Sequence, residues 1–158
     1  MLNESKLNKY YNQIAEKLDE LIPIKWNKIA MYTEEIGDVS SVSFYFYTDN
    51  CAKIHHSGNI PVEYNVNEDV FDSLINELMN INKRLWQEFN NTGEQPWCSF
   101  TFFLDNKWKF KVEYEYERDN EVDTYEREII WAYEKLSIVP EDGYAKKILN
   151  EYLKKDET

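Results

Sequence analysis

The stretch "WCSFTFFLDNKWKFKVEYEYE" (Trp97 to Glu117) contains the pattern on which the fold prediction for this chain rests. Apolar and polar side chains alternate on both sides of Asp105-Asn106, which predicts two strands joined by a tight turn. A two-residue turn would set Phe102 opposite Lys109, whereas a three-residue loop, 105–107, leaves one face wholly apolar and is therefore favoured. The pairs predicted by that loop are Leu104 with Trp108, Phe102 with Phe110, and Phe100 with Val112.

The opposite face of this hairpin is predicted to carry charge. Neighbouring residues of a strand point to opposite faces, so Phe110 and Val112 should be buried while the charged residues between them point away from the core. The outward set on the second strand is Lys109, Lys111, Glu113, Glu115 and Glu117, and the set expected beside it on the first strand is Trp97, Ser99, Thr101 and Phe103.

Acidic residues are concentrated at the end of this hairpin. The 17 residues from Val112 to Glu128 hold eight acids and two arginines, a net charge of −6, while the whole chain of 158 residues carries −12. Like charges along one strand face repel each other, so this arrangement lowers the stability of the free protein. We interpret it first as a docking face for a basic protein, with the candidate binding residues Glu113, Glu115, Glu117, Asp119, Glu121, Asp123 and Tyr125.

Two other interpretations of the acids stay open. A solvated charged face aids solubility and blocks unwanted pairing of strand edges. Paired carboxylates are also typical of hydrolases and of divalent-cation sites, although such catalysis needs one acid in a shielded setting, and an open strand face offers solvation instead. The docking face is favoured because Trp97, Phe103 and Tyr125 are expected near the acids, and aromatic residues flanked by charge are typical of protein interfaces.

The rest of the chain predicts an α+β fold in one domain, 1–158. Apolar residues spaced by three and four predict helices, and alternation predicts strands. The expected architecture is a mainly antiparallel five-stranded sheet packed with N-terminal, middle and C-terminal helices. Helices are predicted over 3–22, 125–136 and 143–154, and a middle helix is predicted to begin after a cap at Asn65 or Asn67 and to run to about Asn90. Three further strands are predicted around turns at Gly37-Asp38 and Asp49-Asn50. The segment 57–69 is expected to be a loop.

Composition excludes several classes of function. A sequence pI near 4.6 argues against direct binding of nucleic acid, because phosphates would repel the chain. There is no basic leader followed by an apolar run and no membrane-length segment, and the two cysteines fit a reducing setting, so we expect a cytoplasmic protein without a membrane partner.

Catalytic and metal-binding motifs are not visible, and no cofactor is expected. The sequence lacks a glycine-rich phosphate loop, a nucleophile elbow and a C-x-x-C pair. The adjacent His55 and His56 should point to opposite faces of a strand, so they and Cys51 cannot converge on a transition metal. We therefore expect structural or surface histidines and a protein that is not an enzyme.

Three segments, in this order and spacing, resemble one family. They are "NQIAEKLDELIPIKW" (Asn12 to Trp26), "NIPVEYNVNEDVFDSLINEL" (Asn59 to Leu78) and "GEQPWCSFTFFLD" (Gly93 to Asp105). Together they look like the YezG-like immunity proteins, which include the staphylococcal EsaG antitoxins. The resemblance covers about residues 1 to 140, and the segment that follows the last strand departs from it with its own acids.

The resemblance implies a cytoplasmic antitoxin that binds and neutralises a toxin exported by the type VII secretion route of Gram-positive bacteria. The best-known partners carry nuclease domains, and an acidic face would complement their basic grooves. No catalytic residue carries over, so a carboxylate-dependent hydrolase or metal-binding enzyme and a secretion chaperone without inhibitory activity stay as alternatives. The matching motif positions are expected to be framework: Ile60, Pro61, Tyr64, Asn65, Val66, Pro96 and Trp97.

Overall fold

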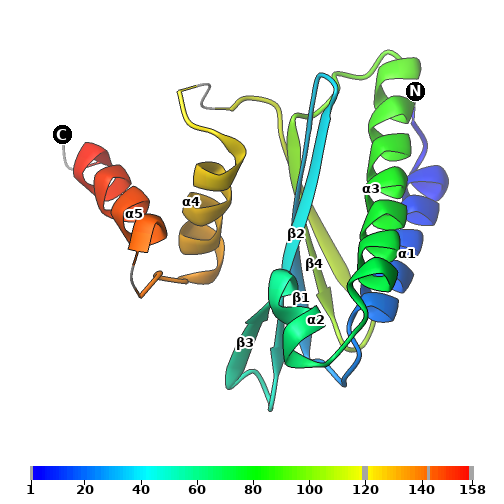
Figure 1. Ribbon diagram of the computed structural model, residues 1–158. Coiled ribbons are helices and arrows are strands. Elements are labelled where there is room, and N and C mark those ends of the chain that lie inside the picture. Colours follow the sequence, from blue (N-terminus) through cyan, green and yellow to red (C-terminus); the bar gives the residue numbers. More distant parts are fainter. Residues whose placement is uncertain (1, 119–120, 142, 157–158) are drawn as a thin grey trace. The chain divides into compact units, whose positions relative to one another are not determined.

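The computed structural model describes residues 2–118, 121–141 and 143–156 (Figure 1). The chain divides into two compact units, 1–117 and 118–158, and each is described by itself. The α+β class is confirmed, because the first unit holds a five-stranded antiparallel sheet together with helices. Packing of the C-terminal helices within one common domain stays a prediction.

The sheet of the first unit has the strand order β3-β2-β1-β4-β5, with antiparallel neighbours throughout. Helices α1 and α3 lie side by side over one face of it (Figure 1). The strands are β1 (Lys28–Ile36), β2 (Val39–Thr48), β3 (Lys53–His56), β4 (Ser99–Asp105) and β5 (Phe110–Glu115); the helices are α1 (Glu4–Leu21), the 3-10 turn η1 (Ser57–Asn59), α2 (Ile60–Glu63) and α3 (Glu68–Asn91).

Local signals explain where these elements begin and end. The side chain of Asn67 accepts a hydrogen bond of 3.1 Å from the N–H of Val70 and caps α3, which confirms one of the two predicted caps. Gly37, with φ +60°, permits the tight β1–β2 turn. The predicted loop 57–69 is wrong in part, since it contains η1 and α2; Pro61 is tolerated there because the first turn of a helix needs no N–H from it.

The core of the first unit lies between the sheet and the two long helices. Its members alternate along the strands and recur every three or four residues along the helices, as the sequence predicts. Val70 is apolar but 54% exposed, because it lies in the first turn of α3 beside the cap. The side chains at the centre of the core, all fully buried, are Ile14, Leu18, Ile29, Met31, Phe44, Phe46, Leu78, Leu85, Phe100 and Phe102.

A polar cluster interrupts this core between α3 and β1. The Asn82 amide nitrogen donates to the Thr33 hydroxyl (3.1 Å), and both residues are fully buried. Further along β1, the Ser40 hydroxyl donates to Glu35 Oε2 (2.7 Å), while Glu35 Oε1 is buried with no hydrogen-bond partner among the described residues. Burial raises the pKa of the Glu35 carboxyl, and the Ser40 hydrogen bond and the charge of Lys83 oppose that rise only in part.

Because the pKa of Glu35 is raised, we predict that the contribution of this residue to the free energy of unfolding depends on pH. The folded protein holds this proton more tightly than the unfolded chain, so the contribution of Glu35 is favourable below the unfolded value of 4.5 and is lost as pH rises through the folded pKa. We expect Glu35→Gln to raise the free energy of unfolding relative to the wild type at pH 7 and to have little effect near pH 4. Urea unfolding across this range tests it, with the exposed Glu16→Gln as control. A difference between Glu35→Gln and the wild type that does not change with pH would contradict it.

The second unit contains α4 (Thr124–Leu136) and α5 (Gly143–Asp156), which pack against each other. The side chain of Asp123 caps α4 by accepting a hydrogen bond from the N–H of Glu126 (2.9 Å). The Tyr152 hydroxyl donates to the Glu134 carboxylate and links the two helices. None of the helices in the described part of the chain is long and apolar enough to cross a membrane.

Candidate partner-binding site

The predicted pairing of the β4–β5 hairpin is wrong by two residues. The observed pairs are Leu104 with Phe110, Phe102 with Val112, and Phe100 with Tyr114. The loop is longer than predicted because Asp105 organises it: its N–H donates to the Lys109 carbonyl (2.9 Å), and its carboxylate accepts from the N–H groups of Lys107 (2.9 Å) and Lys109 (3.0 Å). The backbone donors, the Lys109 N–H first, hold the pKa of the Asp105 carboxyl below its usual value. A slip of two residues preserves the faces of a strand, so the division into apolar and charged sides survives.

The exposure of β5 follows the prediction on its charged side more closely than on its apolar side. Lys109, Lys111 and Glu115 are exposed as predicted, while Glu113 keeps only 32% of its side chain exposed. Phe110 and Val112 are half-buried and pack against the core instead of being fully buried. The reason is position, because β5 is the last strand of the sheet and covers the rim of the core.

Trp97 does not lie beside the acids, which corrects the expected outward set. Ser99, Thr101 and Phe103 lie on the same face as the charged residues, as expected, but they are opposite Glu115, Glu113 and Lys111, two residues further along β5 than the predicted register. The N–H of Cys98 also donates to the Glu115 carbonyl (2.8 Å), so two residues face one here and the alternation stops at Ser99. Trp97 is 1% exposed and packs edge-on against Phe100 (4.8 Å between ring centroids) in the core, in agreement with the framework role that the resemblance implies.

The first unit holds three of the predicted binding residues. Glu113 and Glu115 lie on one face of β5, and Glu117 follows the strand and is exposed. The ammonium group of Lys111 lies 3.9 Å from Glu113 Oε2 on the same face. The structure therefore brings two carboxylates together on β5, with a cationic side chain at one end.

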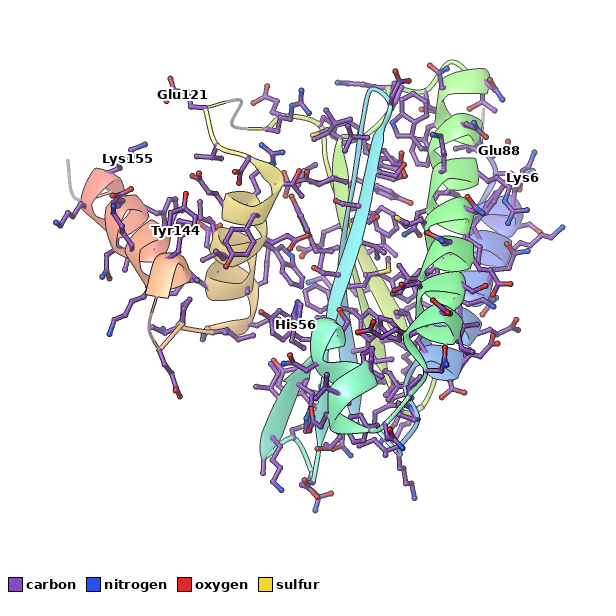
Figure 2. The ribbon with its side chains drawn as sticks, in the orientation of Figure 1. Lys6, His56, Glu88, Glu121, Tyr144 and Lys155 are labelled. Atoms are coloured by element: carbon purple, nitrogen blue, oxygen red, sulfur yellow. The ribbon has the colours of Figure 1, made fainter. Side chains whose placement is uncertain are left out.

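The second unit holds three more. Glu121 is exposed in the segment before α4 (Figure 2). Asp123 is the cap of that helix. Tyr125 is 50% exposed and stacks on Tyr144 of α5, with ring centroids 6.2 Å apart and planes 5° from parallel. Tyr144, which the sequence did not single out, is 61% exposed (Figure 2). Asp119, the remaining predicted residue, lies outside the described residues.

A cleft of about 690 Å³ opens beside β3, and its lining includes Thr48, His55 and Glu63. The spacing of these residues in the sequence did not predict that they lie together. His55 Nε2 lies 2.8 Å from the Thr48 hydroxyl, and His55 Nδ1 lies 3.1 Å from Glu63 Oε1. A hydroxyl, an imidazole and a carboxylate in series can activate a nucleophile, but Thr48 is only 5% exposed, so its hydroxyl is not open to a substrate. We therefore interpret these contacts as structural.

The two histidines point to opposite faces of the sheet, as predicted, since His55 pairs with Phe46 and His56 with Tyr45. His56 Nδ1 accepts a hydrogen bond from the N–H of Gly58 (3.1 Å) and shapes the turn into η1. Within the described residues, no group of three or more His, Cys, Asp or Glu side chains is placed to hold a metal ion.

Comparison with known proteins shows the family of this chain. The family described as "Immunity protein YezG-like" matches residues 7–150. The chain is 38% identical over 145 residues to "Immunity protein YezG" of Bacillus subtilis (strain 168), which covers 90% of this chain and 96% of that protein. It is also 32% identical over 148 residues to "Type VII secretion system protein EsaG" of Staphylococcus aureus (strain NCTC 8325 / PS 47), covering 91% and 90% of the two chains. On the family match and on both relatives, this chain belongs to the YezG-like immunity protein family.

Proposed function

We propose that this protein is a cytoplasmic antitoxin that neutralises a secreted nuclease toxin by stoichiometric binding, without catalysis and without a cofactor. The observation that carries the proposal is the pair of carboxylates, Glu113 and Glu115, on one face of β5 in a chain of net charge −12. Membership of an immunity protein family supports the antitoxin role, and one relative is named as a component of a type VII secretion system.

Electrostatics connects the acidic face to a nuclease. A nuclease domain must be basic where it holds phosphate, so an inhibitor that occupies this groove has to present negative charge. Complementary charge mainly raises the rate of encounter, to as much as about 10⁸–10⁹ M⁻¹s⁻¹. A fast encounter is valuable to a cell that makes the toxin in the same cytoplasm as the antitoxin.

A nuclease assay tests the proposal. The toxin domain would be the nuclease-like C-terminal domain of a long secreted protein encoded by a neighbouring gene, and cleavage of DNA and RNA would be followed while this protein is titrated in. We expect activity to vanish at one antitoxin per toxin domain. Binding with undiminished cleavage would indicate a secretion chaperone, and absence of binding to the toxin domain would refute the proposal.

The Tyr125–Tyr144 pair makes a prediction about the lifetime of the complex. Aromatic side chains anchor interfaces, and their loss acts mainly on dissociation. If Tyr125 anchors the toxin, Tyr125→Ala should speed dissociation about tenfold or more, which corresponds to about 1.4 kcal/mol. Surface-binding kinetics measure this, and Tyr125→Phe, which retains the stacked ring, should dissociate at nearly the wild-type rate. Equal dissociation rates for Tyr125→Ala and the wild type would place the anchor elsewhere.

A further inference from the structure

Strand β5 presents an open edge. It is last in the strand order, with β4 on one side and no strand on the other in the part of the chain that the structure describes. The Lys109 carbonyl accepts from the Asp105 N–H, so the backbone groups of the odd-numbered residues of this strand face β4. In an antiparallel ladder the alternate residues then turn their N–H and C=O groups to the open side, and these residues are Phe110, Val112 and Tyr114.

The charges along this edge are antisymmetric about Val112. Lys109 and Lys111 precede it, and Glu113 and Glu115 follow it at the mirrored positions. All four lie on one face, while Phe110 and Tyr114 lie at mirrored positions on the other and pack against the core. When such a strand is laid antiparallel to its own copy with Val112 opposite Val112, every lysine meets a glutamate.

Each neighbouring register sets one pair of like charges opposite each other. The open-side backbone groups allow the two copies to slide only in steps that keep even-numbered residues opposite each other. One step in one direction sets Lys111 against Lys111, and one step in the other sets Glu113 against Glu113. Like charges directly opposite are destabilising, so the register centred on Val112 is favoured over those on either side.

We propose that two copies of this chain associate through their β5 edges, antiparallel, about a two-fold axis at Val112. Phe110 of one copy then exchanges backbone hydrogen bonds with Tyr114 of the other, and Val112 with Val112. The side-chain pairs are Lys111 with Glu113 and Lys109 with Glu115, each made twice, in the closer, non-hydrogen-bonded positions of the ladder. Both copies keep α1 and α3 on the same side of one continuous sheet, because directly opposed residues share a face.

Charge on an edge strand often prevents pairing, and the arrangement here differs from such protection. A run of one sign repels a second copy in every register. Here the two signs are segregated, which leaves one register without like charges opposite each other over residues 109–115. The contact within the chain between Lys111 and Glu113 is no obstacle, since the lysine side chain is 72% exposed and an exposed pair contributes little. This inference goes beyond the proposed function and does not depend on the toxin.

Sedimentation of the full chain without any toxin tests the inference. We expect the wild type to sediment as a dimer whose dissociation constant rises with salt. Lys109→Glu/Lys111→Glu makes the charges at positions 109–115 uniformly acidic, and Glu113→Lys/Glu115→Lys makes them uniformly basic, so each variant alone should self-associate at least about tenfold more weakly. An equimolar mixture of the two should recover dimers, because every cross-strand pair is then opposite in sign.

A single chain that carries all four exchanges is the control for folding, since it restores the antisymmetric pattern and should dimerise like the wild type. A wild type that stays monomeric at about 100 μM would overturn the inference. So would variants that dimerise as the wild type does, or a mixture that stays monomeric. Toxin neutralisation is measured separately, so failure here leaves the proposed function standing and the reverse holds as well.

Discussion

Replacing Glu113, Glu115 and Glu117 by lysine should slow association with the toxin domain about ten- to hundredfold at low ionic strength. The three acids are the exposed or half-exposed charges of one strand end, and charges at the rim of an interface act on the rate of encounter. The wild-type association rate should fall steeply as salt rises, and the triple variant should lose most of that dependence. Surface-binding kinetics at low and moderate salt measure both effects.

Lys109→Glu/Lys111→Glu is the matched control for this experiment. It changes charges on the same strand and disturbs the proposed self-association as well, yet it adds negative charge, so its association with the toxin should be as fast as that of the wild type or faster. If the triple lysine variant associates at the wild-type rate at both salt concentrations, the acids of β5 form a solvated face and the docking surface lies elsewhere.

Truncation of Trp97 should produce the largest loss of stability among these variants. The side chain is 1% exposed and packs against Phe100 and Tyr114, with ring centroids 4.8 and 5.9 Å away. Trp97→Ala removes this buried surface and leaves a cavity, so the free energy of unfolding should fall by about 3–5 kcal/mol. Urea unfolding followed by far-ultraviolet circular dichroism measures it without relying on tryptophan fluorescence.

Trp108→Ala is the comparison for Trp97→Ala. Trp108 is 38% exposed in the hairpin loop and lies 6.1 Å from Trp26 between ring centroids, a contact worth about 0.5–1.5 kcal/mol. It should therefore cost less than half as much stability. If Trp97→Ala does not fold, Trp97→Phe, which keeps a ring and removes a buried N–H, should fold with a smaller loss. Equal losses for Trp97→Ala and Trp108→Ala would contradict the core position of Trp97.

Periodicity predicts the elements of this fold because burial acts on faces. α1 and α3 follow their apolar stripes, and the strands follow alternation, so the α+β class can be read from residues alone. Details set by single hydrogen bonds could not be predicted in the same way. Asp105 makes three hydrogen bonds to the backbone of the hairpin loop, and the loop is longer as a result. The N–H of Cys98 donates to the carbonyl of Glu115, and Trp97 then points inward.

The sequence predicts which residues of the candidate site are charged and face outward, but it predicts less of how the residues are arranged in space. The acids of β5 alternate with apolar residues, which places Glu113 and Glu115 outward. The sequence also contained a signal that was missed, since Asp123 and Glu126 have the spacing of a helix cap, so Asp123 supports α4 in addition to any docking role. The Tyr125–Tyr144 stack depends on how two helices pack, and no short-range pattern encodes that.

The central pairing of β1 with β4 has a consequence for how fast the sheet can form. β1–β2 and β4–β5 are hairpins between neighbours in the chain, whereas the β1–β4 ladder joins Ile29 to Leu104 across the intervening α3. Closing so long a segment costs chain entropy before the contacts compensate it, and non-local pairing slows folding. Each hairpin alone lacks the neighbour that completes the sheet. Assembly of the first unit is therefore expected to be late and cooperative. A protein of this fold is complete only after its middle helix has been synthesised and the β1–β2 and β4–β5 hairpins have paired.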